Sequence, residues 1–133
     1  PHLGEFSQII GIESNLIEND ILSYGKDFTI KYKCILVLKG APTIIFNPAG
    51  EAFINTTGNS GMAKFGSGDV LTGVIAGILS QNKNPETAAI AGVYLHSLSA
   101  DLVLTEKPIS NYLASDIMNN YPSAVKFLEG SIV

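Results

Sequence analysis

The most informative stretch of this chain is Gly66-Ser67-Gly68-Asp69, which an apolar run at residues 70–79 follows directly. Within that run the apolar residues recur with helical spacing, so a helix is predicted to begin at the glycines. The first turn of a helix leaves backbone N–H groups without partners at the positive end of the helix dipole, where small residues let an anion approach closely. Asp69 adds a carboxylate to the same turn. The stretch therefore predicts an anion site beside a base, the arrangement that phosphoryl transfer to a hydroxyl requires.

The composition is that of one small globular domain. The chain has 133 residues, of which 46% are hydrophobic and 15% charged, with a formal net charge of -4. This length allows a single domain. No apolar run approaches the roughly 18 residues of a membrane span, no signal peptide is visible, and no basic cluster indicates nucleic acid as a partner. The one cysteine, Cys34, cannot form an internal disulfide, which favours a cytoplasmic protein with Cys34 as a small core residue.

Apolar spacing, together with capping residues, predicts helices along much of the chain. They are expected at residues 4–10, 20–32, 66–79, 85–104, 114–120 and 122–129. Gly11 closes the first helix, and Gly73 and Gly77 are expected to let the third approach a sheet closely. Asn84 and the proline after it form an N-cap for the fourth, which is apolar nearly all round and therefore buried. Poor helix formers predict an interruption of that helix near residues 97–99.

Strands are predicted only in the first half of the chain. Residues 34–38 are apolar throughout, as in a strand that a parallel sheet buries on both faces. Residues 43–46 and 52–54 flank the turn sequence Asn-Pro-Ala-Gly at 47–50 and predict a β-hairpin. Too few other strands are visible to surround the strand at 34–38. We therefore expect the chain to be one part of a larger α/β sheet protein.

Four stretches of the sequence resemble the signature of one enzyme family. They are residues 55–73, which contain the Gly-Ser-Gly-Asp motif, Pro-His-Leu-Gly-Glu-Phe at 1–6, Val-Leu-Lys-Gly-Ala-Pro-Thr at 37–43, and Gly-Val-Tyr-Leu-His at 92–96. In this order they are similar to the ATP- or ADP-dependent NAD(P)H-hydrate dehydratases of the ribokinase-like superfamily. The resemblance implies the C-terminal part of a ribokinase-like three-layer α/β/α fold, with a β-hairpin and several buried helices. It also implies that residues 1–133 are a segment of a single domain whose N-terminal half supplies most of the central sheet.

The resemblance also implies roles for individual residues. Asp69 would contact the hydrated nicotinamide at the hydroxyl being phosphorylated and act as the catalytic base, and His2 would hold the dinucleotide substrate. The residues that would contact the nucleotide are Lys39, Gly40, Ala41, Pro42, Thr43, Gly66, Ser67 and Gly68. Glu5 either supports these groups or positions a magnesium-bound water, whereas His96, within an apolar helix, is predicted to be a core residue. No cage of carboxylates is visible, so Mg²⁺ is expected to arrive with the nucleotide phosphates.

The implied reaction repairs a damaged cofactor. Water added to the nicotinamide ring of NADH or NADPH leaves a hydroxyl, giving NADHX or NADPHX. Phosphorylation by ATP or ADP turns that hydroxyl into a phosphate leaving group, which the ring nitrogen expels. The resemblance further implies a homo-oligomer and an NAD(P)HX epimerase, either fused to the protein or working with it.

Two alternatives to this function stay open. A ribokinase-superfamily kinase of a vitamin-like or sugar alcohol would use the same Asp69, and a non-catalytic nucleotide-binding domain would keep the fold. The intact Asp69 and glycines speak against the second of these. Lys64 and Phe65 depart from the small residues that the family often has before the motif, so the choice between ATP and ADP stays open.

Overall fold

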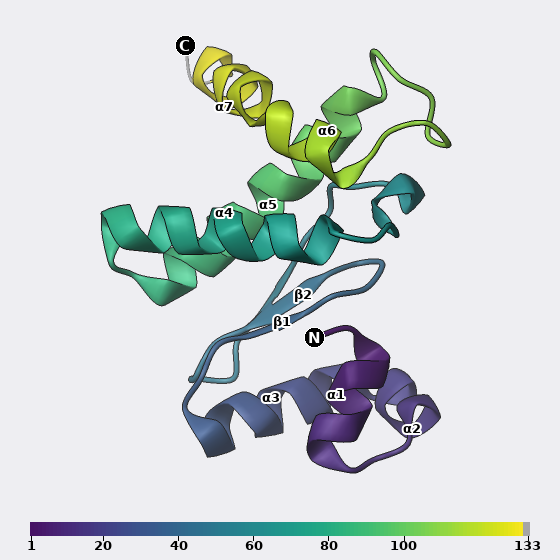
Figure 1. Cartoon of the computed structure of the whole chain (residues 1–133). Helices are drawn as coiled ribbons and strands as arrows, with labels where there is room; N and C mark the ends of the chain where they lie inside the picture. Colours follow the sequence, from purple (N-terminus) through teal and green to yellow (C-terminus); the bar gives the residue numbers. More distant parts are fainter. Residues whose placement is uncertain (132–133) are drawn as a thin grey trace. The chain divides into compact units, whose positions relative to one another are not determined.

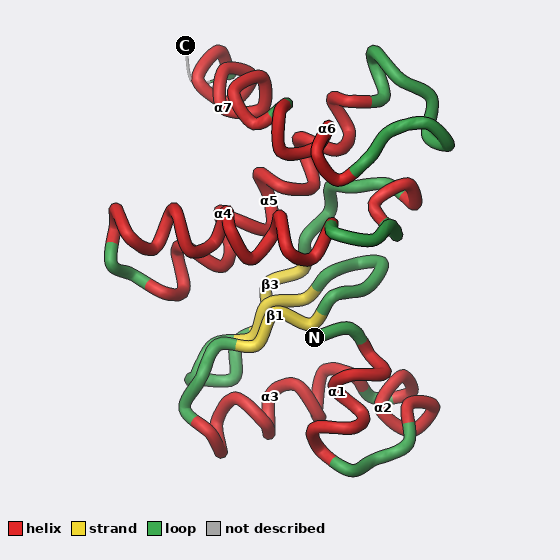
Figure 2. The backbone as a smooth tube through the Cα atoms, viewed as in Figure 1, coloured by secondary structure: helices red, strands yellow, loops and turns green. Residues whose placement is uncertain are grey.

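A computed structural model describes residues 1–131, and the chain divides into two compact units. The first unit spans residues 1–56, and the second begins at Thr57. Figure 1 shows the elements of each unit, and Figure 2 shows that helices dominate the chain apart from one small sheet. None of the helices within residues 1–131 is both long and apolar enough to cross a membrane.

The first unit consists of three helices and a three-stranded sheet. Its elements are α1 (Leu3–Ile10), α2 (Ser14–Asn19), α3 (Ile21–Tyr32), β1 (Leu36–Leu38), β2 (Ile44–Phe46) and β3 (Ala52–Ile54). The strands pair antiparallel in the order β1-β2-β3. A buried cluster joins the helices to the sheet, and its members are Phe6, Ile17, Leu36, Leu38, Ile44 and Phe46.

The helices of this unit form largely as the sequence predicts, and α2 is an additional one. α1 ends at Gly11, which has the left-handed φ of 69° that a helix C-cap favours. α3 contains Gly25 because the Phe46 ring packs against its backbone, and a Cβ at that position would lie 2.3 Å from the ring. The glycine that weakens the helical pattern is therefore the residue that brings helix and sheet together.

The predicted hairpin is confirmed. β2 and β3 pair antiparallel around residues 47–50, with Ile44 opposite Ile54. The Gly50 N–H donates to the Asn47 carbonyl oxygen at 2.9 Å, the hydrogen bond of a tight turn. The Asn47 side chain stabilises the same turn, because its Oδ1 accepts from the N–H of Ala49 and of Glu51.

The predicted strand at residues 34–38 is shorter than expected and differently paired. It begins at Leu36, because the Cys34 N–H donates to the Thr29 carbonyl oxygen and keeps this segment at the end of α3. Cys34 is only partly buried and is not part of the core cluster. The neighbour of β1 is the antiparallel β2, and the parallel contact in the described residues is a single bridge between His2 and Lys39.

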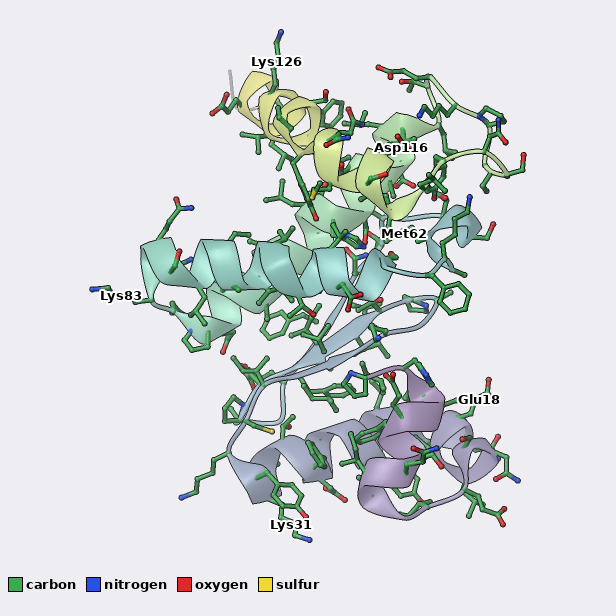
Figure 3. The ribbon with its side chains drawn as sticks, viewed as in Figure 1. Glu18, Lys31, Met62, Lys83, Asp116 and Lys126 are labelled. Atoms are coloured by element: carbon green, nitrogen blue, oxygen red, sulfur yellow. The ribbon has the colours of Figure 1, made fainter. Side chains whose placement is uncertain are left out.

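The second unit is helical. Its elements are the short 3₁₀ helix η1 (Ser60–Met62), α4 (Ser67–Asn82), α5 (Pro85–Val103), α6 (Ala114–Asn119) and α7 (Tyr121–Gly130). α4 and α5 form a helical hairpin across a turn at Lys83, whose side chain points outward in Figure 3. Gly92 of α5 lies so close to α4 that a Cβ there would be 2.6 Å from the Ile75 side chain. A second buried cluster consists of Ala100, Val103, Tyr112 and Ile117.

One prediction for this unit is wrong, and another is not tested. A Cβ at Gly73 or Gly77 would meet nothing within 4 Å of the described residues, so their contact with a sheet stays a prediction, and the close approach of α4 to α5 occurs at Gly92. The predicted interruption near residues 97–99 is absent, and α5 is continuous to Val103. The Ser99 hydroxyl, which would compete with the helix backbone, donates instead to the Ile117 carbonyl oxygen at 2.6 Å.

Candidate active site

The residues of the predicted anion site, Gly66 to Asp69, form the start of α4. Gly66 is its N-cap and has a left-handed φ of 84°. The Ser67 N–H donates to the Lys64 carbonyl oxygen at 3.2 Å, and the Val70 N–H donates to the Gly66 carbonyl oxygen at 3.0 Å. Between them, the N–H groups of Gly68 and Asp69 have no acceptor among residues 1–131. Two adjacent donors are thus available to an external anion.

Asp69 belongs to the same turn as these donors. Asp69 is exposed, and it is the acidic residue of the first turn of α4. A carboxylate here lies next to whatever group the two N–H donors bind. The structure therefore places Asp69 in the first turn of α4, and its role as a base stays a prediction.

Ser67, in contrast, is buried, and its hydroxyl lies 3.2 Å from Nε2 of His96 on α5. The other ring nitrogen of His96, Nδ1, lies 3.0 Å from the Tyr121 hydroxyl at the start of α7. Burial lowers the pKa of His96 to about 4 and raises that of the Tyr121 hydroxyl. His96 is accordingly a neutral, buried residue, as predicted, but it contacts the motif directly.

The loop before α4 is held by an acidic side chain of α5. Oδ2 of Asp101 accepts from the Gly58 N–H at 2.8 Å, and Oδ1 accepts from Nδ2 of Asn59 at 2.8 Å. Gly58 has a φ of 108°, in the region that glycine tolerates best. Asp101 thus binds two consecutive residues of the signature stretch, residues 55–73, to α5.

Tyr112 holds the middle of the same loop. Its hydroxyl donates to Oδ1 of Asn59, and burial raises the pKa of that hydroxyl. Gly61 lies against the Tyr112 ring, where a Cβ would be 2.5 Å from the hydroxyl oxygen. Nζ of Lys64 lies 4.6 Å from the ring centroid and donates to the Tyr112 carbonyl oxygen. Asn59, Gly61 and Lys64 therefore have internal partners, whereas Phe65 is fully exposed.

In the first unit, the structure brings together residues from two separate sequence motifs. The Lys39 N–H donates to the Pro1 carbonyl oxygen at 2.7 Å, which joins the end of β1 to the segment before α1. Nζ of Lys39 lies 3.6 Å from Oε2 of Glu5, and Nε2 of His2 lies 3.4 Å from Oε1 of the same carboxylate. His2, Glu5 and Lys39 form one polar cluster.

His2 and Glu5 also cap α1. The His2 N–H donates to Oε2 of Glu5 at 2.6 Å, and Nδ1 of His2 accepts from the Glu5 N–H at 3.2 Å. The hydrogen bond that the His2 N–H donates to the carboxylate, with a smaller contribution from Lys39, lowers the pKa of Glu5. Gly4 leaves room for the imidazole, because a Cβ there would lie 3.1 Å from the ring. The His2 side chain is still 59% exposed and so available to a ligand.

The remaining predicted residues, from Gly40 to Thr43, form a tight exposed loop after β1. The Thr43 hydroxyl donates to the Gly40 carbonyl oxygen at 3.2 Å and accepts from the Gly40 N–H at 3.4 Å. Ala41 and Pro42 are exposed between them. In the described residues, no group of three or more His, Cys, Asp or Glu side chains is placed to hold a metal ion.

The predicted site residues thus form one group in each unit. The first contains His2, Lys39, Gly40, Ala41, Pro42 and Thr43, and the second contains Gly66, Ser67, Gly68 and Asp69. Sequence reasoning did not identify Asp101, Tyr112 or Tyr121 as residues that support the motif. Their partners are 42, 53 and 25 residues away, so no local pattern connects them.

Comparison with solved structures shows the class of protein. The chain matches the crystal structure of an ADP/ATP-dependent NAD(P)H-hydrate dehydratase from Bacillus subtilis, co-crystallised with ATP/Mg²⁺, with a TM-score of 0.90 and 36% identity. The match covers 95% of this chain and 46% of that one. A ribokinase-like superfamily protein from Enterococcus faecalis matches with a TM-score of 0.79 and 37% identity, over 95% of this chain and 42% of that one. The chain therefore has a ribokinase-like α/β fold.

Sequence comparison identifies the family within this class. The model of the NAD(P)H-hydrate dehydratase family matches residues 1–123, and the chain belongs to that family. It is 36% identical over 129 residues to the ADP-dependent (S)-NAD(P)H-hydrate dehydratase of Bacillus subtilis, covering 97% of this chain and 47% of that protein. It is 38% identical over 132 residues to the bifunctional NAD(P)H-hydrate repair enzyme Nnr of Moorella thermoacetica, covering 99% of this chain and 25% of that protein. The chain thus spans about half or a quarter of the relatives' lengths.

Proposed function

We propose that the intact protein is an NAD(P)H-hydrate dehydratase that uses ATP or ADP to remove water from NADHX and NADPHX. The observation that carries this proposal is the pair of unpaired N–H donors at Gly68 and Asp69, with the Asp69 carboxylate in the same turn. Family membership and the match to a dehydratase co-crystallised with ATP/Mg²⁺ support the assignment. A kinase or a non-catalytic nucleotide-binding domain has no comparable support.

In this proposal the first turn of α4 acts on the transferring phosphoryl group. The N–H groups of Gly68 and Asp69 stabilise its negative charge, as oriented backbone donors do at helix N-termini. Asp69 accepts the proton of the substrate hydroxyl as the oxygen attacks phosphorus. Gly66 allows the left-handed turn that directs these donors outward.

The cluster of the first unit is proposed to bind the substrates. Lys39 and the loop from Gly40 to Thr43 contact the nucleotide, where Nζ of Lys39 offsets phosphate charge. His2 contacts the dinucleotide through its exposed imidazole. Glu5 orients both side chains, because its two carboxylate oxygens lie within 3.6 Å of His2 and of Lys39.

Mg²⁺ is proposed to bind through the nucleotide phosphates. Oxygen ligands from phosphates and water suit Mg²⁺, which proteins usually bind through only one or two carboxylates. The nucleotide supplies the phosphoryl group that makes the substrate oxygen a leaving group. The ring nitrogen then expels phosphate, and loss of a proton from the adjacent carbon restores the dihydropyridine.

The organisation of the whole protein is also a proposal. We propose that residues 1–133 correspond to the C-terminal segment of a single ribokinase-like domain, as the 47% coverage of the Bacillus subtilis relative supports. The bifunctional relatives support a second repair activity, which we propose to be an epimerase in the same or a partner protein. A cytoplasmic homo-oligomer remains the expected state.

The decisive experiment is an assay of the intact protein. Hydrated NADH or NADPH is incubated with Mg²⁺ and either ATP or ADP, and the absorbance of the dihydronicotinamide ring is followed. Nucleotide-dependent return of that absorbance supports the proposal. A stable phosphorylated alcohol with no return of absorbance would instead indicate the kinase, and nucleotide binding without turnover would indicate the non-catalytic domain.

A further inference from the structure

A hydrogen-bonded chain of three side chains lies behind the first turn of α4. It runs from the Ser67 hydroxyl to Nε2 of His96 at 3.2 Å, and from Nδ1 of His96 to the Tyr121 hydroxyl at 3.0 Å. Ser67 and His96 are 6% and 3% exposed. These two hydrogen bonds connect α4, α5 and α7, three elements separated in the sequence but all within the second unit.

Ser67 has a special place in the turn. Its neighbours Gly66 and Gly68 have no side chains, so Ser67 is the only residue at positions 66–68 whose side chain can fix the turn to the rest of the protein. The turn also has no side-chain cap, because the N-cap is a glycine. The contact with His96 therefore provides the anchor that a capping side chain would otherwise supply.

His96 suits this role because it connects two hydroxyl groups through its two ring nitrogens. A neutral imidazole has one N–H donor and one acceptor, and a hydroxyl can complement either. Every buried side-chain nitrogen and oxygen among the described residues has a hydrogen-bond partner, these included. Loss of one member would leave a buried polar atom unpaired, which is costly.

We propose that His96, oriented by Tyr121, is a positioning residue that holds Ser67 and thereby aligns the free N–H groups of Gly68 and Asp69 for phosphate. This inference rests on the proposed function for its consequence in nucleotide binding. The alignment itself is a property of the protein without ligand. His96 has no contact with substrate in this role and acts through Ser67.

Two substitutions of His96 separate the two hydrogen bonds. His96→Gln places an amide near the position of Nε2 and keeps a partner for Ser67, whereas His96→Asn places it near Nδ1 and keeps a partner for Tyr121. We expect His96→Asn to weaken nucleotide binding about tenfold, the effect of one lost hydrogen bond to a buried group, and His96→Gln to weaken it much less. Both substitutions are expected to lower the melting temperature.

The double variant Ser67→Ala, His96→Asn tests whether the effect passes through Ser67. If His96 acts through the Ser67 hydroxyl, the double variant binds nucleotide no more weakly than Ser67→Ala alone. Ser99→Ala is the matched control, because it removes another buried hydroxyl of α5, one that donates to the Ile117 carbonyl oxygen of α6. It is expected to lower the melting temperature with nucleotide binding unchanged.

Two measurements in the intact protein keep the inference distinct from the proposed function. Titration calorimetry with ATP and ADP gives the affinity, and amide hydrogen exchange without ligand reports the order of the first turn of α4. Faster exchange at the hydrogen-bonded amides of Ser67 and Val70 in His96→Asn but not in Ser99→Ala supports the inference, even if the wild type binds no nucleotide and the proposed function fails. Unchanged exchange and affinity in His96→Asn, or additive losses in the double variant, would overturn it.

Discussion

Gly66 and Gly68, two residues apart, are the same residue type for different physical reasons. Gly66 has a φ of 84°, which an L-residue adopts only at a cost, whereas Gly68 is the second residue of a regular helix and is not among the residues with positive φ. A glycine is thus favoured at 66 by the left-handed backbone conformation of that residue. We propose that the glycine at 68 lets an anion approach an unpaired N–H donor closely, which matters only when an anion is bound.

This difference predicts opposite results for two alanine variants. Gly66→Ala is expected to lower the stability by about 1–2 kcal/mol, the cost of a left-handed alanine. Gly68→Ala is expected to leave the stability of the ligand-free protein unchanged or slightly higher, and to weaken ATP and ADP binding at least tenfold. Thermal unfolding and calorimetric titration measure the two effects. If Gly68→Ala unfolds more easily and binds nucleotide normally, Gly68 is a structural residue and the phosphate site lies elsewhere.

Asp69 is the second residue whose role can be isolated. Asp69→Asn keeps the shape and exposure of the side chain but removes the base, so turnover is expected to fall by roughly 10²–10⁴ with nucleotide affinity retained. The measurement is the steady-state rate with NADHX in the intact protein. Asp116→Asn, which changes a carboxylate paired with Lys107, serves as the control. Near-normal turnover of the Asp69 variant would remove the catalytic assignment.

At the scale of elements, α5 organises the site without contributing to the predicted ligand contacts. Asp101 of α5 holds Gly58 and Asn59 of the loop before α4, and His96, almost one and a half turns earlier, contacts Ser67. The close approach of α4 and α5 at Gly92 places both contacts within reach. The conformation of the signature stretch is therefore determined largely by a helix that follows it.

Removal of the Asp101 carboxylate tests this dependence. In Asp101→Ala the Gly58 N–H and the Asn59 amide lose their shared acceptor, so the free energy of unfolding is expected to fall by about 1–3 kcal/mol. Urea unfolding provides the measurement, and Glu106→Ala, an exposed acidic residue just beyond α5, is the control for loss of charge. A loss no larger than that of the control would show that the loop does not depend on Asp101.

At the scale of the whole molecule, each unit has its own core, and the stability of the second unit is linked to pH through His96. Burial lowers the pKa of this residue from 6.5 to about 4. The unfolded chain therefore takes up a proton near pH 6.5, whereas the folded protein resists protonation until about pH 4. The contribution of neutral His96 to the free energy of unfolding is complete above pH 6.5 and is lost as the pH falls from 6.5 to 4.

The expected size of this loss is about 3 kcal/mol, from 2.5 pKa units at 1.36 kcal/mol each. It can be measured by urea unfolding at a series of pH values between 7 and 4. The variant His96→Gln has no group that titrates at this position, so its stability is expected to fall less over the same range. Equal pH dependence in the two proteins would mean that other groups, chiefly carboxylates, account for the acid sensitivity.

Much of the architecture was predictable because its signals are local. Helix boundaries at Gly11 and Asn84, the turn at residues 47–50 and the apolar stripe of α4 all depend on residues within a few positions of each other. The same is true of the Gly-Ser-Gly-Asp turn, since the N–H donors belong to the motif itself. The expectation that failed, an interrupted α5, concerns a feature that distant residues decide, because the Ser99 hydroxyl finds its partner at Ile117.

The sequence by itself determined the family, most of the helices and the position of the Gly-Ser-Gly-Asp turn, because helix periodicity, capping and glycine conformation are short-range properties. Only the tertiary structure showed that Lys39 lies beside Glu5, that Gly25 accommodates Phe46, and that Ser67 is bound to His96. These contacts join residues from about 20 to 35 positions apart, and they form only when apolar burial brings separate elements together. Side-chain partners at such separations leave no periodic pattern in the chain, so the fold has to reveal them.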